Sequence, residues 1–171
     1  LEDYKETTDR PIYAYCASMA ASGGYYLACS ADKILMNRNC MTGSIGVTAG
    51  TYIDISGFLE KQGIKTTSIY VGKNKTMGSY FEGFTDEQKK IYTDILMETY
   101  DQFVQVVSDG RGLTTEQVTA LADGRIYSPK QAVTDKLADG IMTEKEAKAA
   151  MTKGCDLGDG VQYIDYSPSA N

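Results

Sequence analysis

The stretch MAASGGYYLA, residues 19–28, places a single serine among small residues. Ser22 follows a β-rich run, PIYAYCAS, and precedes residues whose Ala, Tyr and Leu content favours a helix. Free N–H groups at a helix start stabilise negative charge, and adjoining glycines let a substrate backbone approach closely. Acyl transfer by an exposed hydroxyl needs these features, with the Gly23 N–H as the first oxyanion donor. The alternative is a tight strand–helix turn built from small residues.

The chain contains no histidine, so a serine nucleophile needs another base. Lysine can serve when burial and a hydrogen bond to the neutral amine lower its pKa from about 10.4 by several units. Most of the lysines lie on polar helical faces. Lys73 and Lys75 differ, because they follow an expected strand in a glycine-flanked loop of the kind that builds α/β sites. The same loop is compatible with a solvated turn.

A second serine, Ser44, lies in the glycine-rich stretch TGSIGV. Its hydroxyl could orient a lysine amine by donating a hydrogen bond to it. The alternative for this stretch is a glycine turn that precedes a strand.

The order of the expected elements defines the fold class. Strands are expected over residues 11–18, 32–37 and 65–72, and helices over residues 19–31 and 51–64. Four later helices each begin with a hydroxyl cap and a Gln or Glu three residues on: Thr85 with Gln88, Thr114 with Gln117, Ser128 with Gln131, and Thr143 with Glu146. We therefore predict an α/β fold with a mostly parallel sheet flanked by helices and a helical C-terminal half.

Composition limits the function further. The 171 residues fit one domain, which we place over residues 1–154, with a C-terminal tail over 155–171 that contains a short strand at 161–166. A net charge of −6 without a basic, aromatic stripe argues against a nucleic-acid partner. No apolar run approaches the roughly 18 residues that span a membrane, and no signal peptide opens the chain. Because the polar start at Leu1 lacks Met, we expect a fragment that lacks upstream strands.

The four cysteines show no CxxC spacing: Cys16, Cys29, Cys40 and Cys155. Without histidine, a zinc site would need all four thiolates or added carboxylates. We therefore expect no metal and no cofactor, and thiols that are buried or free. One disulfide among the three early cysteines is an open alternative.

Several segments together resemble the signal peptide peptidase A family, the Ser-Lys peptidases whose fold is related to Clp protease and crotonase proteins. The resemblance covers about residues 10 to 145. The segments are MAASGGYYLACSADKILMN, TGSIGV, GKNKTMGS, FTDEQKKIYTDILMETYDQFVQVVSDGRGL and ADGRIYSPKQAVTDKLADGI.

The resemblance implies roles for particular residues. It makes Ser22 the nucleophile, Lys75 the general base (with Lys73 the weaker candidate), Ser44 the residue that orients the lysine, and Gly23 an oxyanion donor. A groove for apolar peptides is expected to be lined by Tyr25, Tyr26, Met77 and Tyr80. The family's second oxyanion donor and its N-terminal membrane anchor lie on segments that this sequence does not contain.

The resemblance also implies a function and partners. We expect a serine endopeptidase that hydrolyses remnant signal peptides at the cell membrane, with an extracytoplasmic catalytic domain. Family members form homo-oligomeric rings or domes in which neighbouring protomers share sites. The alternatives are a phage capsid-type or other Ser-Lys peptidase of the superfamily, and a non-catalytic, crotonase-like assembly domain.

Overall fold

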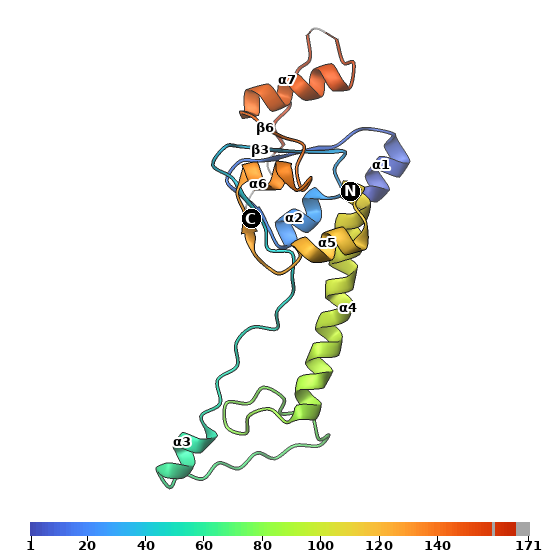
Figure 1. Cartoon of the computed structure of the whole chain (residues 1–171). Coiled ribbons are helices and arrows are strands. Elements are labelled where there is room, and N and C mark those ends of the chain that lie inside the picture. Colours follow the sequence, from blue (N-terminus) through green and yellow to red (C-terminus); the bar gives the residue numbers. More distant parts are fainter. Residues whose placement is uncertain (159, 167–171) are drawn as a thin grey trace. The chain divides into compact units, whose positions relative to one another are not determined.

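A computed structural model describes residues 1–158 and 160–166, which group into two compact units (Figure 1). The first unit contains Leu1–Ile45 and the chain from Val104 onward, and the second is Gly46–Phe103. Part of the predicted tail, residues 159 and 167–171, lies outside the described residues. A single domain over residues 1–154 stays a prediction.

The first unit contains two small sheets. In one, β1 (Tyr13–Cys16), β3 (Lys33–Met36) and β6 (Gly140–Ile141) are parallel, in the order β1-β3-β6. In the other, β2 (Met19–Ala21) pairs in parallel with β4 (Met41–Gly43), and β4 pairs antiparallel with β5 (Ile126–Tyr127). The helix expected over 19–31 therefore begins only after β2, because β4 pairs with residues 19–21. The prediction of an α/β fold with mostly parallel pairing is confirmed, although the pairing is divided between two sheets.

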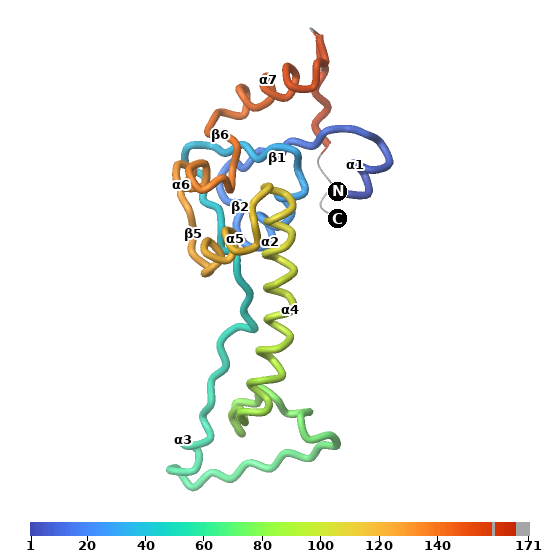
Figure 2. The backbone as a smooth tube through the Cα atoms, turned by 45° about the vertical axis from the view of Figure 1, so that its right-hand side comes forward, coloured from blue at the N-terminus to red at the C-terminus, as the bar shows by residue number. Residues whose placement is uncertain are grey.

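Helices surround these strands (Figure 2). They are α1 (Glu2–Thr8), α2 (Gly23–Ala28), α5 (Thr115–Leu121), α6 (Pro129–Thr134) and α7 (Glu144–Gly154), and α4 (Asp86–Arg111) belongs to both units. All four predicted capping boxes are present. The helical C-terminal half is therefore confirmed. Each of these helices begins where a capping side chain accepts a hydrogen bond from a free backbone N–H group of the first turn.

The core of the first unit joins helices to the sheets. The side chains of Ile34, Met36, Val107 and Leu137 are fully buried. Tyr25 is 0% exposed, and its hydroxyl donates a 2.8 Å hydrogen bond to the Leu137 carbonyl. This bond ties α2, which follows Ser22, to the segment after α6.

The second unit contains α3 (Ser56–Lys61), long irregular stretches on both sides of it, and the first part of α4. Its one ring cluster among the described residues joins Tyr52, Phe84 and Tyr92, with centroids 4.8 to 5.7 Å apart. The predicted helix over 51–64 is shortened to α3. The apolar side of α4 is also only partly covered, since Ile95 is 54% exposed.

Two predicted strands are wrong. Residues 65–72 and 161–166 form no strand. A strand needs a neighbour to accept its backbone hydrogen bonds, and the described part of the chain supplies none to either segment. In the first segment Ile69 and Val71 are each 96% exposed.

Gly110 and Gly57 make a matched pair of helical glycines. A Cβ on Gly110 would overlap the Cys29 carbonyl, whereas a Cβ on Gly57 would meet no atom within 4 Å. We predict that Gly110→Ala lowers the free energy of unfolding by about 1–3 kcal/mol despite its better helix propensity. Gly57→Ala should be neutral or stabilise by up to about 1 kcal/mol. Thermal melting measures both, and equal melting temperatures for the two variants would contradict the close approach at Gly110.

All four cysteines are free thiols, so the alternative of a disulfide is not realised in this structure. Burial raises the pKa of Cys16 to about 11 and that of Cys29 to about 12. Because the thiolate is the nucleophile, both should resist alkylation at pH 8 in the folded protein. We predict that iodoacetamide first modifies Cys155, which is only half-buried, and reaches the other thiols after unfolding. Mass spectrometry of peptides from briefly treated protein tests this, and early labelling of Cys16 or Cys29 counts against it.

Candidate active site

Ser22 occupies a sharp turn between β2 and α2. It is the N-cap residue of α2, with φ 53° and ψ −124°, and its side chain makes no capping bond. Positive φ is uncommon for residues other than glycine and costs about 1–3 kcal/mol, so surrounding contacts must hold it. The residue is exposed. A strained strand-to-helix turn that presents an exposed serine hydroxyl is the geometry of a nucleophile elbow.

Backbone bonds on both sides hold this turn. The Ser22 N–H donates to the Gly43 carbonyl over 2.8 Å, and the Ser22 carbonyl accepts from Tyr25 and Tyr26 N–H groups at 2.9 Å each. Tyr25 is also anchored in the core through Leu137. The hydroxyl is therefore presented by a fixed backbone, and the hydroxyl itself takes no part in holding that backbone.

Open space lies beside the two glycines that follow Ser22. Gly23 and Gly24 are exposed, and a Cβ on either would meet no atom of the chain within 4 Å. Among residues 1–158 and 160–166, no group accepts a hydrogen bond from the Gly23 N–H. This N–H is thus available to a ligand oxygen beside Ser22, as an oxyanion donor must be.

Ser44 lies next to this turn because of strand register. Ala21 is the register partner of Gly43, so Ser22 and Ser44 each follow the last residue of two neighbouring parallel strands. Ser44 is half-buried, has φ 50°, and donates its N–H to the Arg125 carbonyl over 2.7 Å. The carboxyl ends of parallel strands are where sites of open α/β sheets form. The structure therefore brings these two predicted site residues to one edge.

The candidate bases lie in the second unit. Lys75 is exposed, and its N–H closes a turn with the Gly72 carbonyl at 3.0 Å. Lys73 instead forms an ion pair with Glu87 at 2.6 Å. In the described part of the chain, no carboxylate pairs with the Lys75 amine, which favours Lys75 over Lys73 as a base that must lose its proton. The candidate nucleophile, Ser22, belongs to the first unit, and the candidate base, Lys75, belongs to the second.

The four predicted substrate-lining residues differ in exposure. Tyr25 is fully buried, so its ring belongs to the core and offers no surface to a ligand. Tyr26 and Met77 are half-buried, and Tyr80 is 57% exposed. The helical spacing that places Tyr26 beside the turn directs Tyr25 inward.

Sequence reasoning missed the residues that hold the two serines. Gly43 bonds Ser22, and a Cβ at Gly43 would lie 2.5 Å from Tyr127 Cδ2 and 2.8 Å from the Arg125 carbonyl oxygen. Its φ of 89° also favours glycine. The available signal was a glycine directly before Ser44; nothing local identified Arg125 or Tyr127.

Two further observations concern metal ligands and membrane-spanning helices. Over residues 1–158 and 160–166, no three His, Cys, Asp or Glu side chains gather as a metal site would require. None of the helices described for this chain combines the length and apolar character needed to cross a bilayer.

Alanine substitutions at Gly43 and Gly24 test whether Tyr127 and Arg125 pack closely against Gly43. We predict that Gly43→Ala lowers the free energy of unfolding by about 3 kcal/mol, because the new methyl group meets Tyr127 and Arg125 at a positive φ. Gly24→Ala should leave it unchanged or slightly raised, since nothing occupies that space. Urea denaturation of both variants measures the difference. An undisturbed Gly43→Ala variant would mean that the turn can relax away from Tyr127.

Comparison with known proteins identifies the family of this chain. A family model described as peptidase family S49 matches residues 5–158. A protein of Enterococcus faecium assigned as a signal peptide peptidase SppA is 40% identical over 92% of this chain and 45% of its own length. Capsid assembly protease C of Escherichia phage lambda is 31% identical over 86% of this chain and 33% of its own length. Protease 4 of Haemophilus influenzae is 30% identical over 81% of this chain and 22% of its own length. The chain thus spans less than half the length of these relatives, and it belongs to peptidase family S49.

Proposed function

We propose that this chain carries the catalytic centre of a serine endopeptidase in which Ser22 is the nucleophile and Lys75 the general base. The observation that carries the proposal is the backbone of Ser22: an exposed serine held at φ 53° where a parallel strand meets a helix. Such strain persists where function requires it and the surroundings enforce it. The absence of histidine in the sequence and membership of a peptidase family support a lysine base.

The proposed reaction proceeds through an acyl-enzyme. Ser22 Oγ attacks the peptide carbonyl carbon while the neutral Lys75 amine takes the hydroxyl proton, and the lysine then returns it to the leaving amine. A water molecule then takes the place of the departed amine: it gives a proton to Lys75 and attacks the ester carbonyl carbon. Lys75 passes this proton to Ser22 Oγ, which leaves as the free hydroxyl. The Gly23 N–H stabilises the oxyanion together with a second donor, which the resemblance implies. The fold that we propose, as the resemblance implies, is Clp protease/crotonase-like.

A lysine base needs a lowered pKa, and the second unit alone leaves Lys75 exposed. Further packing must therefore remove it from water before it can act at neutral pH. We propose that this packing arises in a homo-oligomeric ring or dome whose protomers share sites. A Ser44 hydroxyl that donates to the neutral amine would lower the lysine pKa further.

The proposed substrates are remnant signal peptides, cleaved within their apolar stretch. Tyr26, Met77 and Tyr80 offer apolar surface for such a peptide. The relative from Enterococcus faecium, assigned as a signal peptide peptidase, supports this substrate class. We propose in addition that the protein acts at the cell membrane, with an extracytoplasmic catalytic domain. The phage lambda relative supports the second candidate, a capsid-type peptidase with the same chemistry. The third candidate function is that of a non-catalytic assembly domain.

Substitution of the dyad tests the proposal in the complete protein. We predict that Ser22→Ala and Lys75→Ala each reduce hydrolysis of a quenched fluorescent signal-peptide sequence by at least about 10³-fold, because each removes a reacting group. Lys73→Ala is the matched control and should retain activity. Loss with Lys73→Ala but not with Lys75→Ala reverses the base assignment.

The same assay separates the other functions. Activity that survives in Ser22→Ala rules out this serine as nucleophile. A wild-type protein that is folded but inactive on every peptide favours the assembly domain. Cleavage of capsid protein in preference to signal peptide favours the phage-type peptidase.

A further inference from the structure

We propose that the turn formed by Asp123, Gly124 and Arg125, together with Tyr127, is a positioning element that sets the backbone of Ser44 and through it the base. The inference rests on the proposed function, since it assigns a role within that site. These residues carry no reacting group. They act by fixing where the Ser44 hydroxyl lies.

Two backbone bonds connect the turn to the segment around Ser44. The Ser44 N–H donates to the Arg125 carbonyl at 2.7 Å, and the Gly124 N–H donates to the Ile45 carbonyl at 3.0 Å. They continue the antiparallel pairing of β4 with β5 beyond the last strand residues. Because Gly43 and Ser44 both have positive φ, the chain bends sharply there, and these bonds fix the bend on either side of Ser44.

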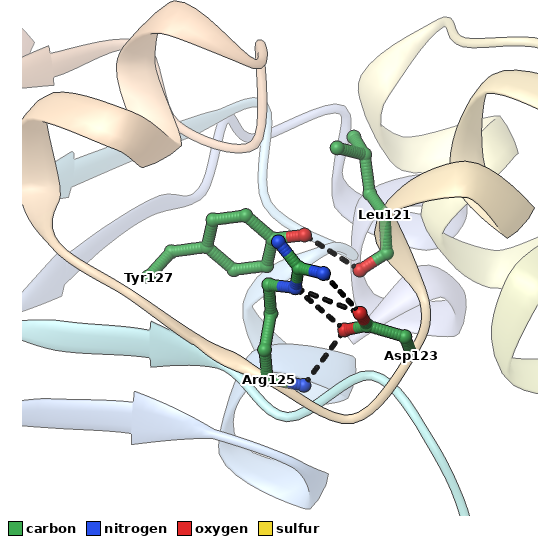
Figure 3. A network of polar contacts seen from close by, with 4 residues as sticks. All are labelled: Leu121, Asp123, Arg125 and Tyr127. Atoms are coloured by element: carbon green, nitrogen blue, oxygen red, sulfur yellow. Dashed lines mark hydrogen bonds and ion pairs between the residues drawn. The ribbon is translucent and has the colours of Figure 1, made fainter.

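One carboxylate organises the turn (Figure 3). Asp123 Oδ1 accepts the Arg125 N–H at 3.1 Å and Nε at 2.8 Å, and Oδ2 accepts from Nε at 2.8 Å and from Nη2. An exposed ion pair alone contributes little to stability. Here the same carboxylate also holds the Arg125 backbone, so its effect is on the direction of the Arg125 carbonyl that receives the Ser44 N–H.

Tyr127 supports the turn from the buried side. Its hydroxyl donates to the Leu121 carbonyl at 2.7 Å, at the end of α5, and the residue is only 4% exposed (Figure 3). Its ring fills the space that a side chain at position 43 would need. The turn thus cannot move toward β4 without displacing this ring.

The ionisable groups at the turn do not titrate near neutral pH. The hydrogen bonds with Arg125 lower the pKa of Asp123, and the same bonds raise the pKa of Arg125. Burial raises the pKa of Tyr127, which Asp135 also faces. A change in the pH dependence of the reaction therefore reports on the base.

The test uses the complete protein and a quenched fluorescent apolar peptide. A displaced Ser44 no longer stabilises the neutral amine, so the lysine pKa rises and the acidic limb of kcat against pH moves to higher pH. For Asp123→Ala we predict a shift of about one pH unit and a fall in kcat of about 10- to 100-fold at neutral pH, with KM unchanged. Ser44→Ala should shift the limb in the same direction. Asp123→Asn, which keeps an acceptor for the Arg125 N–H, should recover part of the loss.

Glu144→Ala is the matched control, because Glu144 forms an exposed ion pair with Lys148 at 2.7 Å in the same unit. This variant should keep the wild-type dependence of kcat on pH. The change in its melting temperature shows how much the loss of one exposed ion pair alters stability alone. If Asp123→Ala fails to fold, Tyr127→Phe, which removes only the bond to Leu121, should give a smaller shift in the same direction.

Three outcomes overturn the inference. If Ser44→Ala shifts the profile and the turn variants do not, the positioning role is wrong and the proposed function stands. If Ser44→Ala leaves the profile unchanged, Ser44 does not set the lysine pKa, and the inference fails while the dyad stands. If Ser22→Ala remains active, the proposed function fails and the inference fails with it.

Discussion

The hydrogen bond from the Ser22 N–H to the Gly43 carbonyl is the contact on which the candidate site depends. It joins the ends of β2 and β4 at the point where both strands leave the sheet. Ser22 and Ser44 each adopt a positive φ that costs about 1–3 kcal/mol, and a single backbone hydrogen bond returns only about 0.5–1.5 kcal/mol. Several bonds must therefore converge on this edge, and they do so from α2 and from the segment before β5.

Glycine serves two different purposes at this edge. At Gly43 a side chain would overlap Tyr127 and Arg125, so the chain's own packing requires glycine. At Gly23 and Gly24 the space is empty and the φ values do not demand glycine. Helix propensity would favour alanine there. What these two positions gain from glycine is an unobstructed approach to Ser22, which matters to a ligand rather than to the fold.

The elements that sequence reasoning predicted correctly are those with local causes. The capping box at Thr143 forms between residues three positions apart, so the residues themselves specify it. The strand expected over 65–72 has suitable residues, but a strand also depends on a distant partner that sequence patterns do not reveal. Ser22 could be placed at a strand–helix turn because its neighbours are unusual. Arg125 could not be linked to Ser44, because only the pairing of β4 with β5 brings them together.

The exposure of the Lys75 side chain sets a condition on any mechanism in which this lysine is the base. Each pKa unit by which a lysine is lowered corresponds to about 1.36 kcal/mol of disfavoured charge, so reaching neutral pH requires about 4–5 kcal/mol of desolvation and hydrogen bonding. One hydroxyl provides about 1 kcal/mol of this. The remainder must come from surfaces that cover the amine, and the second unit does not cover it. The exposed apolar side chains of that unit, among them Ile69 and Val71, are suited to such a surface. In the proposed homo-oligomer, burial of these side chains would favour association, and the same association would cover the proposed base.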